Sequence, residues 1–144
     1  MILITTVHIR WSKLCKLSEI HNHEHAHSKG IYAIYRVHSG NETLLYIGKT
    51  KRNFQKRLKE HHKDWICGAK GIQVRLGILE FPDGERYSEN KLADVESLLI
   101  HWQEPPENTS SINFYRGRDI LEVVNLGNRG VLKRRISTKK FDDW

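Results

Sequence analysis

Two tyrosines in mirrored tripeptides are the first residues whose types and spacing suggest chemistry. Gly30-Ile31-Tyr32 and Tyr46-Ile47-Gly48 flank the turn residues Ser39-Gly40-Asn41, which predicts an antiparallel hairpin over residues 30–38 and 43–48. We expect an odd-length loop, which places both phenols on one face near one end of the hairpin. Because glycine lets a phosphate come close, this end of the hairpin is a candidate ligand-binding surface. The alternative is a pair of ordinary core tyrosines.

The segment after the hairpin carries an arginine and a histidine on an expected helix. Asn53 is suited to cap a helix that runs to about Asp64, and the helical period gives it an apolar stripe of Phe54, Leu58 and Trp65. His61 falls within this stripe and Arg57 borders it. An arginine in that position suits bidentate phosphate binding, since its planar guanidinium is always charged. Taken singly, Arg57 is better explained by a surface ion pair and His61 by a packed imidazole.

A second expected helix holds a carboxylate among apolar residues. It begins at Ser88 or Glu89 and must end before Pro105. Glu96 falls inside an arc of Leu92, Ala93, Val95, Leu98, Leu99, Ile100 and Trp102. The opposite face, expected to be solvated, holds Asp94, Ser97, His101 and Glu104. A lone carboxylate in such an arc is costly unless a cation meets it, and an arginine or lysine at the rim of the core is the simpler candidate.

These motifs in combination resemble the GIY-YIG endonuclease family. Both tripeptides occur in order, Lys49-Thr50 follows them, and then comes Arg57-Leu58-Lys59-Glu60-His61. The resemblance covers residues 30–108. In that family the glutamate on the helix after the third strand is the metal ligand, often followed by a proline nine residues later and an asparagine twelve later. The matching residues here are Glu96, Pro105 and Asn108, with Asn113 as the second choice for the asparagine.

The resemblance implies metal-assisted hydrolysis of a phosphodiester. One Mg²⁺ or Mn²⁺ ion would be held by the Glu96 carboxylate, waters and phosphate oxygens, and Arg57 would hold the scissile phosphate. Tyr32 is expected to activate the attacking water, Tyr46 to position the phosphate, and Asn108 to help order the site. His61 stays the alternative base, because imidazole exchanges protons at neutral pH more readily than a phenol.

Composition agrees with a polyanionic partner. The chain has 144 residues, with 24 Lys and Arg against 17 Asp and Glu, a net charge of +7. An acidic membrane would suit that charge equally well, but no basic amphipathic helix stands out and no apolar run reaches the ~18 residues of a membrane span. Two cysteines make no disulfide framework, and residues 1–9 are a poor signal peptide, so we expect a cytoplasmic protein.

The expected fold is α+β, with a small central antiparallel three-stranded sheet flanked by helices; residues 72–81 supply the third strand. Residues 1–144 are expected to form a single domain with a nuclease-like core at 30–108. Around this core we expect extensions at 1–29, with an edge strand at 1–9 and a helix at 10–20, and at 109–144, with a basic hairpin.

Residues 21–27 read His-Asn-His-Glu-His-Ala-His. Alternate histidines share one face of an extended strand and are suited to bind zinc or nickel. A structural zinc site usually takes its four ligands from two separate elements, and nothing downstream supplies the others. We therefore interpret this stretch as a polar connector that adds positive charge near DNA.

The sequence predicts a compact DNA endonuclease without a small-molecule cofactor, acting on double-stranded or branched DNA; RNA stays open as a substrate. The rivals are a non-catalytic basic nucleic-acid binder with a degenerate site and a metal-storing protein that uses residues 21–27. The target, the biological role and the oligomeric state are not specified by any motif. Contacts to nucleic acid are expected from Gly48, Lys49, Arg116, Arg118, Lys133, Arg134 and Arg135.

Overall fold

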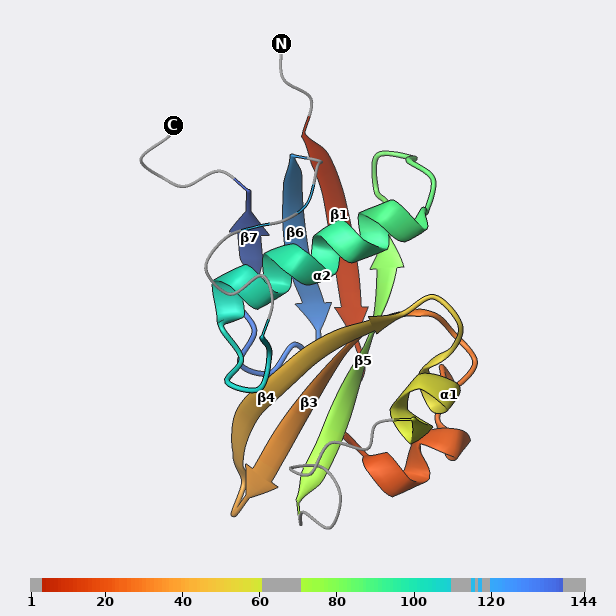
Figure 1. Cartoon of the computed structure of the whole chain (residues 1–144), viewed down its shortest axis with the longest axis vertical. Coiled ribbons are helices and arrows are strands. Elements are labelled where there is room, and N and C mark those ends of the chain that lie inside the picture. The colour runs from red at the N-terminus through yellow and green to blue at the C-terminus, as the bar shows by residue number, and fades with distance from the viewer. Residues whose placement is uncertain (1–3, 61–70, 110–114, 116, 118–119, 139–144) are drawn as a thin grey trace.

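Figure 1 shows a computed structural model of the chain, which describes residues 4–60, 71–109, 115, 117 and 120–138. The elements follow in the order β1 (Thr5–Trp11), β2 (Cys15–Lys16), the 3₁₀-helix η1 (Leu17–Asn22), β3 (Gly30–His38), β4 (Asn41–Thr50), α1 (Phe54–Lys59), β5 (Ile72–Glu80), α2 (Glu89–Gln103), β6 (Leu121–Gly127) and β7 (Arg135–Ser137). No helix in these described residues is long and apolar enough to cross a membrane.

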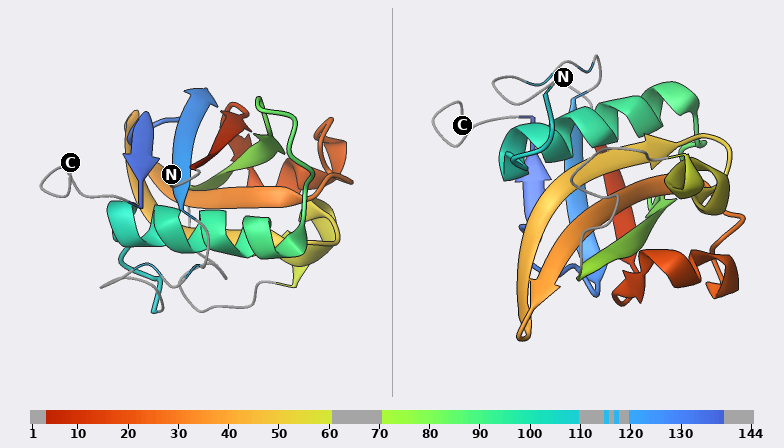
Figure 2. Two further views of the ribbon diagram at one scale, coloured as in Figure 1. Left: turned by 90° about the horizontal axis from the view of Figure 1, so that it is seen from above. Right: turned by 60° about the horizontal axis from the view of Figure 1, so that its bottom comes forward.

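The strands form one curved mixed sheet, so the prediction of a small three-stranded antiparallel sheet flanked by helices is wrong. The order is β4-β3-β5-β1-β6-β7, with β2 also paired to β5. β1 runs parallel to β6, whereas the other pairs are antiparallel. Figure 2 shows the sheet curling into an open half-barrel. The three expected strands, β3, β4 and β5, are therefore one half of a larger sheet, and both extensions supply strands to the other half.

The N-terminal extension departs most from prediction. β1 lies inside the sheet between β5 and β6, and the helix expected over residues 10–20 is replaced by the end of β1, by β2 and by η1. Val7, Ile9 and Trp11 alternate along β1 and are all buried. Trp11, Leu14 and Leu17 match a helical period, but pairing of β1 with two distant strands decides the outcome, and a local pattern does not reveal that pairing.

The sheet is covered on both faces, as predicted for a central layer. On one face α2 packs Leu92, Val95, Leu98 and Leu99 against Ile31, Ala33 and Ile47. On the other face α1 and η1 pack Phe54, Leu58 and Ile20 against Tyr32 and Ile34. The hairpin of β3 and β4, which carries the two tripeptides of interest, therefore lies between two apolar layers, which fix the side chains on each face.

α2 begins and ends where the sequence predicts. The Ser88 side chain caps it by accepting a hydrogen bond of 3.1 Å from the Lys91 backbone N–H. The helix stops at Glu104, which has a left-handed backbone with φ of 46°, one residue before Pro105. The expectation of a solvated outer face is wrong for Asp94 and Ser97, which are 9% and 7% exposed, whereas Glu104 is exposed as expected. An apolar arc predicts which side of a helix packs, not whether the other side is covered.

The C-terminal extension contains the predicted hairpin in outline. β6 and β7 pair antiparallel, with Val123 opposite Ile136. β7 is shorter than the Val131–Ser137 segment that we expected to be a strand, because pairing begins only at Arg135. The Trp102 indole N–H donates a 2.8 Å hydrogen bond to the Ser137 carbonyl, so β7 lies beside the C-terminal end of α2 (Figure 1).

Candidate active site

A β-bulge brings the two tyrosines to one face of the hairpin. β3 and β4 are joined by Ser39 and Gly40, both with positive φ, which is an even-length loop and not the odd one expected. That loop alone would place Tyr32 and Tyr46 on opposite faces. The register shifts between Ile34 and Tyr35, which leaves one extra residue in β4, and the parity changes. The prediction that both tyrosines share one face is thus confirmed, but the β-bulge and not the length of the loop is the cause.

Tyr32 and Tyr46 lie side by side on this face. Their ring centroids are 6.3 Å apart with an interplanar angle of 28°. Gly48 is directly opposite Tyr32 in the ladder, and a Cβ atom there would lie 2.4 Å from the Tyr32 hydroxyl. Gly30 is equally constrained, because a Cβ atom added to it would lie 2.2 Å from the Gly77 carbonyl oxygen. Both glycines therefore make room within the sheet, and Gly48 is buried under a phenol ring.

The loop after α2 holds β4 at the bulge. Glu107 donates its backbone N–H to the Leu45 carbonyl at 2.9 Å. The Asn108 side chain then accepts from the Ile47 N–H and donates to the Ile47 carbonyl, each at 2.9 Å, and Asn108 is 6% exposed. These three hydrogen bonds fix the residues on either side of Tyr46. Asn108 therefore orders the site through the backbone, as a positioning residue; Asn113 lies outside the described residues.

Asn108→Ala is expected to destabilise the fold and to lower kcat. It leaves the buried N–H and C=O of Ile47 without a partner, which costs about 2 kcal/mol, and it releases the strand that carries Tyr46. We expect a lower Tm and a kcat about tenfold lower at a temperature where the variant is folded, with KM nearly unchanged. Asn41→Ala, at an exposed asparagine of the same strand, is the matched control. An unchanged kcat in folded Asn108→Ala protein would contradict this role.

Glu96 of α2 meets a cation at the edge of the core. Its carboxylate Oε1 lies 3.6 Å from the Lys49 ammonium, and the Glu96 side chain is 21% exposed. Burial raises the pKa of Glu96, while the charges of Lys49 and Arg57 act in the opposite direction. Glu96 in turn contributes to raising the pKa of both Tyr32 and Tyr46. These residues come from β3, β4, α1 and α2, and they share one electrostatic environment.

The Tyr32 hydroxyl is a phenol and not a phenolate at neutral pH in the free protein. Burial raises the pKa of Tyr32 well above 10. The charge of Arg57 and a hydrogen bond between the two side chains lower it, but less than burial raises it. Activation of a water by the Tyr32 phenolate would need nearby cations to lower this pKa, and Arg57 alone does not offset the effect of burial. Burial likewise raises the pKa of Tyr46.

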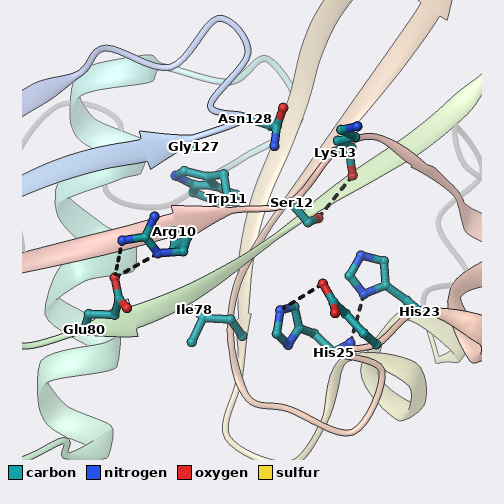
Figure 3. Close-up of a pocket in the computed structure, with 11 residues that line it drawn as sticks. Arg10, Trp11, Ser12, Lys13, His23, His25, Ile78, Glu80, Gly127 and Asn128 are labelled. Carbon is teal, nitrogen blue, oxygen red and sulfur yellow. Dashed lines mark hydrogen bonds and ion pairs between the residues drawn. The ribbon is translucent and has the colours of Figure 1, made fainter.

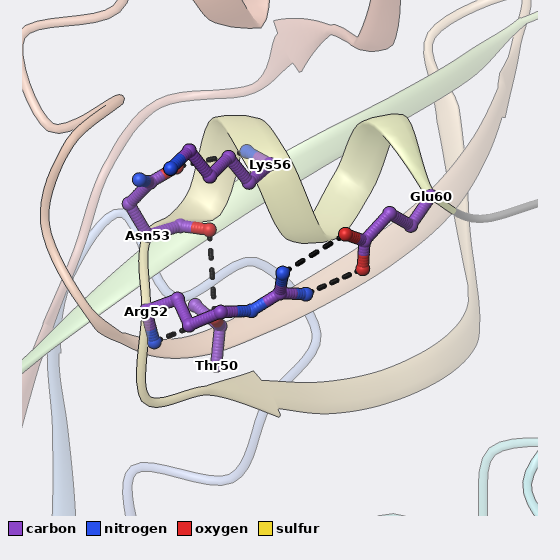
Figure 4. Close-up of polar contacts among 5 residues, drawn as sticks. All are labelled: Thr50, Arg52, Asn53, Lys56 and Glu60. Carbon is purple, nitrogen blue, oxygen red and sulfur yellow. Dashed lines mark hydrogen bonds and ion pairs between the residues drawn. The ribbon is translucent and has the colours of Figure 1, made fainter.

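The helix that carries Arg57 is fixed at its first turn. Asn53 caps α1 by accepting from the Lys56 N–H at 2.8 Å, as predicted. Arg52, in the loop before the helix, forms a bidentate pair with Glu60, one contact being 2.9 Å (Figure 4). The Arg57 side chain is half-buried and lines a cavity of about 380 Å³ together with Lys49, Thr50, Lys51, Arg52, Glu89 and Leu92. A concave, cationic surface therefore opens beside the tyrosines.

The histidine-rich segment is an ordered support for this helix. The carbonyls of Ala26 and Ser28 accept hydrogen bonds of 3.0 Å from the N–H groups of Gln55 and Phe54, which lack partners within the helix. The His23 Nδ1 atom accepts from the His25 N–H at 3.0 Å, and burial lowers the pKa of His23. The segment is more than a polar connector, because it anchors α1 and with it Arg57.

The remaining predicted residues are placed elsewhere or are not described. His61, Arg116 and Arg118 lie outside the described residues. Lys133 and Arg135 are exposed near the C-terminal end of α2, where the Lys133 ammonium lies 5.2 Å from the centre of the Trp102 ring and Arg135 pairs with Glu122 at 2.8 Å. Arg134 beside them is also exposed. These three cations do not line the cavity beside Arg57.

Sequence reasoning missed the cations between the hairpin and α1. Lys51 and Arg52 line the cavity with Arg57, and their signal was their position directly after the second tripeptide. It also missed Arg75, which is 7% exposed within the sheet, pairs with Glu42 at 2.6 Å and donates to the Asn128 carbonyl at 2.9 Å. A single arginine in an apolar strand gives no sign of such partners.

The Glu96 carboxylate fits a hard divalent cation that needs few ligands from the protein. In the parts of the chain that the structure describes, no group of three or more His, Cys, Asp or Glu residues is placed to hold a metal ion. This does not support metal storage by residues 21–27. Mg²⁺ commonly uses one or two carboxylates and completes its shell with waters and phosphate oxygens. The half-buried Glu96 carboxylate is compatible with that requirement.

The paired phenols on β3 and β4, the arginine on α1 and the carboxylate on α2 thus act on one another electrostatically. Residues 28–109 match the family model for the GIY-YIG catalytic domain. The chain therefore belongs to the GIY-YIG family, a nuclease family whose substrates are nucleic acids and whose members generally use divalent metals. No curated protein and no solved structure matches the chain.

Proposed function

We propose that this protein is a divalent-metal-dependent DNA endonuclease that hydrolyses phosphodiester bonds with a single metal ion. The observation that carries the proposal is the placement of Glu96. Among the described residues, Glu96 is the carboxylate whose charge acts on the Tyr32 hydroxyl, and it is opposed by Lys49 and Arg57, which line a cationic cavity. Carboxylate, guanidinium and phenol are the groups that a phosphodiester hydrolase needs to hold a metal, a phosphate and a water.

Each residue has a distinct proposed role. Glu96 would hold Mg²⁺ or Mn²⁺, which when bound supplies stabilisation of the negative charge on the leaving oxygen. Arg57 holds the scissile phosphate and offsets the charge that grows on it. Tyr46 positions that phosphate. Tyr32 or His61 accepts the proton of the attacking water, and for Tyr32 this requires more positive charge than Arg57 provides, since burial keeps its pKa high.

Removal of the metal tests this proposal. Supercoiled plasmid incubated with the protein and Mg²⁺ is expected to be nicked or linearised, because the metal provides several kcal/mol of transition-state stabilisation. An excess of EDTA is expected to abolish the cleavage, and added Mn²⁺ to restore it; agarose electrophoresis measures both. Cleavage that persists at the same rate in EDTA would refute a metal-dependent mechanism.

One observation favours the rival function, a nucleic-acid binder without catalysis. The ion pair between Lys49 and Glu96 gives the carboxylate a counter-charge in the absence of any metal. If the protein is such a binder, its net charge of +7 attracts the phosphates of the nucleic acid. The binder predicts that wild-type protein never cuts plasmid in Mg²⁺, and that Glu96→Gln and Arg57→Ala proteins bind DNA as tightly as wild type does.

A further inference from the structure

Three neighbouring hollows follow one another from the candidate active site across the N-terminal extension. The first is the 380 Å³ cavity beside Arg57. The second, of about 410 Å³, shares Arg52 with the first. The third, of about 560 Å³, shares Ile78 with the second. Because each hollow shares a lining residue with the next, the three are neighbours in a row from Arg57 to the C-terminal end of β1.

The middle hollow is formed by the segment that leads into β3 and by the loop before α2. His27, Ser28 and Lys29 line it on one side and Tyr87 on the other. The Lys29 ammonium lies 3.9 Å from the centre of the Tyr87 ring, and Lys29 is exposed. The carbonyl of Ser28 is bonded to the Phe54 N–H, so this wall is attached to the helix of Arg57.

The distal hollow lies between the C-terminal end of β1 and the histidine-rich turn. Figure 3 shows Arg10, Ser12 and Lys13 on one side of it, facing His23 and His25 on the other. Arg10 is paired with Glu80 at 3.2 Å, whereas Lys13 is exposed. Lys and Arg outnumber Glu along the three hollows taken together, whereas the distal hollow itself holds Arg10 and Lys13 against Glu24 and Glu80. Most residues of this distal hollow precede residue 28, where the match to the family model begins.

We propose that this row of hollows, the flank groove, binds the sugar-phosphate backbone of duplex DNA on one side of the cleaved bond, and that the N-terminal extension supplies its distal half. The inference rests on the proposed function, since it takes Arg57 as the site of the scissile phosphate. Spaced Lys and Arg side chains at the rim of a groove bind successive phosphates without regard to sequence. The extension is thereby a substrate-binding element as well as part of the sheet.

The walls favour a duplex backbone over a single strand. Single strands are held largely by stacking of bases on open aromatic rings. Trp11 is 2% exposed, and its indole N–H is bonded to Asn125. The Tyr87 ring packs against the core and has the Lys29 ammonium over one face. Neither ring offers an open surface, whereas the ammonium groups of Lys13 and Lys29 are accessible.

The test compares two double variants that remove the same charge, both in the Glu96→Gln background so that no cleavage interferes. Lys13→Ala/Lys29→Ala removes two cations of the flank groove. Arg36→Ala/Lys59→Ala removes two exposed cations that do not line it. The affinity for a fluorescein-labelled 30-base-pair duplex is measured by anisotropy from low to moderate salt. We expect the groove variant to bind about tenfold more weakly, with a salt slope smaller by about two, and the control to stay within about twofold.

Two results would overturn the flank groove. The first is an equal loss of affinity in both double variants, which would mean that the affinity depends on net charge and not on the position of the cations. The second is an unchanged affinity in the groove variant. Tighter binding of a single strand than of the duplex, with the same loss in the groove variant, would overturn the choice of duplex. Plasmid cleavage by wild-type protein separates the two proposals. If wild-type protein cuts plasmid and the two double variants bind the duplex equally well, the flank groove is wrong and the proposed endonuclease function stands. If wild-type protein neither cuts nor binds DNA, both proposals are wrong.

Discussion

Glu96→Gln is expected to lower the single-turnover rate of plasmid cleavage by about a thousandfold or more. The substitution keeps the size of the side chain but removes the carboxylate that would hold the metal, and a loss of about 4 kcal/mol of transition-state stabilisation corresponds to that factor. The fold is expected to persist, because Lys49 is 41% exposed and stays hydrated when its partner is neutral.

Two measurements make the Glu96 result specific. Glu104→Gln, at an exposed glutamate just past the end of the same helix, is expected to cleave at the wild-type rate. Duplex binding by Glu96→Gln protein is expected to be at least as tight as that of wild type, since one negative charge is removed. A variant that retains more than a tenth of the wild-type rate would show that this carboxylate is an ordinary partner of Lys49.

Arg57→Ala is expected to lower the same rate by about 100-fold to 1,000-fold. The guanidinium donates to the group that carries the growing charge, and removal of one such donor from a partly desolvated site has effects of this size. Arg57 also bonds to Tyr32 and opposes the effect of burial on the pKa of Tyr32, so its loss further disfavours the phenolate. Single-turnover kinetics at saturating protein measure the effect without a contribution from binding.

Two further variants of α1 separate geometry from charge. Arg57→Lys keeps the charge but not the planar fork, and we expect it to recover only part of the rate, to about a tenth of wild type. Lys59→Ala removes an exposed cation of the same helix and is expected to cleave normally. If Lys59→Ala and Arg57→Ala were equally slow, the effect would come from the charge of the helix and not from contact with the phosphate.

The hairpin and Glu96 were predictable because their evidence is local. β-Branched and aromatic side chains over residues 30–38 and 43–48, on either side of Ser39-Gly40-Asn41, predict both strands, and the helical period places Glu96 in an apolar arc from residue types alone. The bulge in β4 was not predictable. The shared face of Tyr32 and Tyr46 depends on one extra residue near Leu45, whose carbonyl is held by Glu107 from a distant loop.

The larger sheet was not predictable because its pairing is non-local. β1 ends at Trp11 and lies between β5, which begins only at Ile72, and β6, which begins at Leu121. The same reason explains the histidine-rich segment. Its carbonyls bond to the first N–H groups of α1, and nothing in its composition indicates that partner. The solvated face assigned to Asp94 and Ser97 failed because periodicity reports one packed side of a helix only.

The location of the metal tests the central claim most directly. Crystals of Arg57→Ala protein with duplex DNA and Mn²⁺ would give an anomalous difference map in which each Mn²⁺ ion appears as a peak. We predict one strong peak in contact with the Glu96 carboxylate and a phosphate oxygen of the DNA. This peak is expected near the face of the β3–β4 hairpin that carries Tyr32 and Tyr46. A Mn²⁺ peak that contacts DNA elsewhere, with Glu96 still bonded to Lys49, would contradict it.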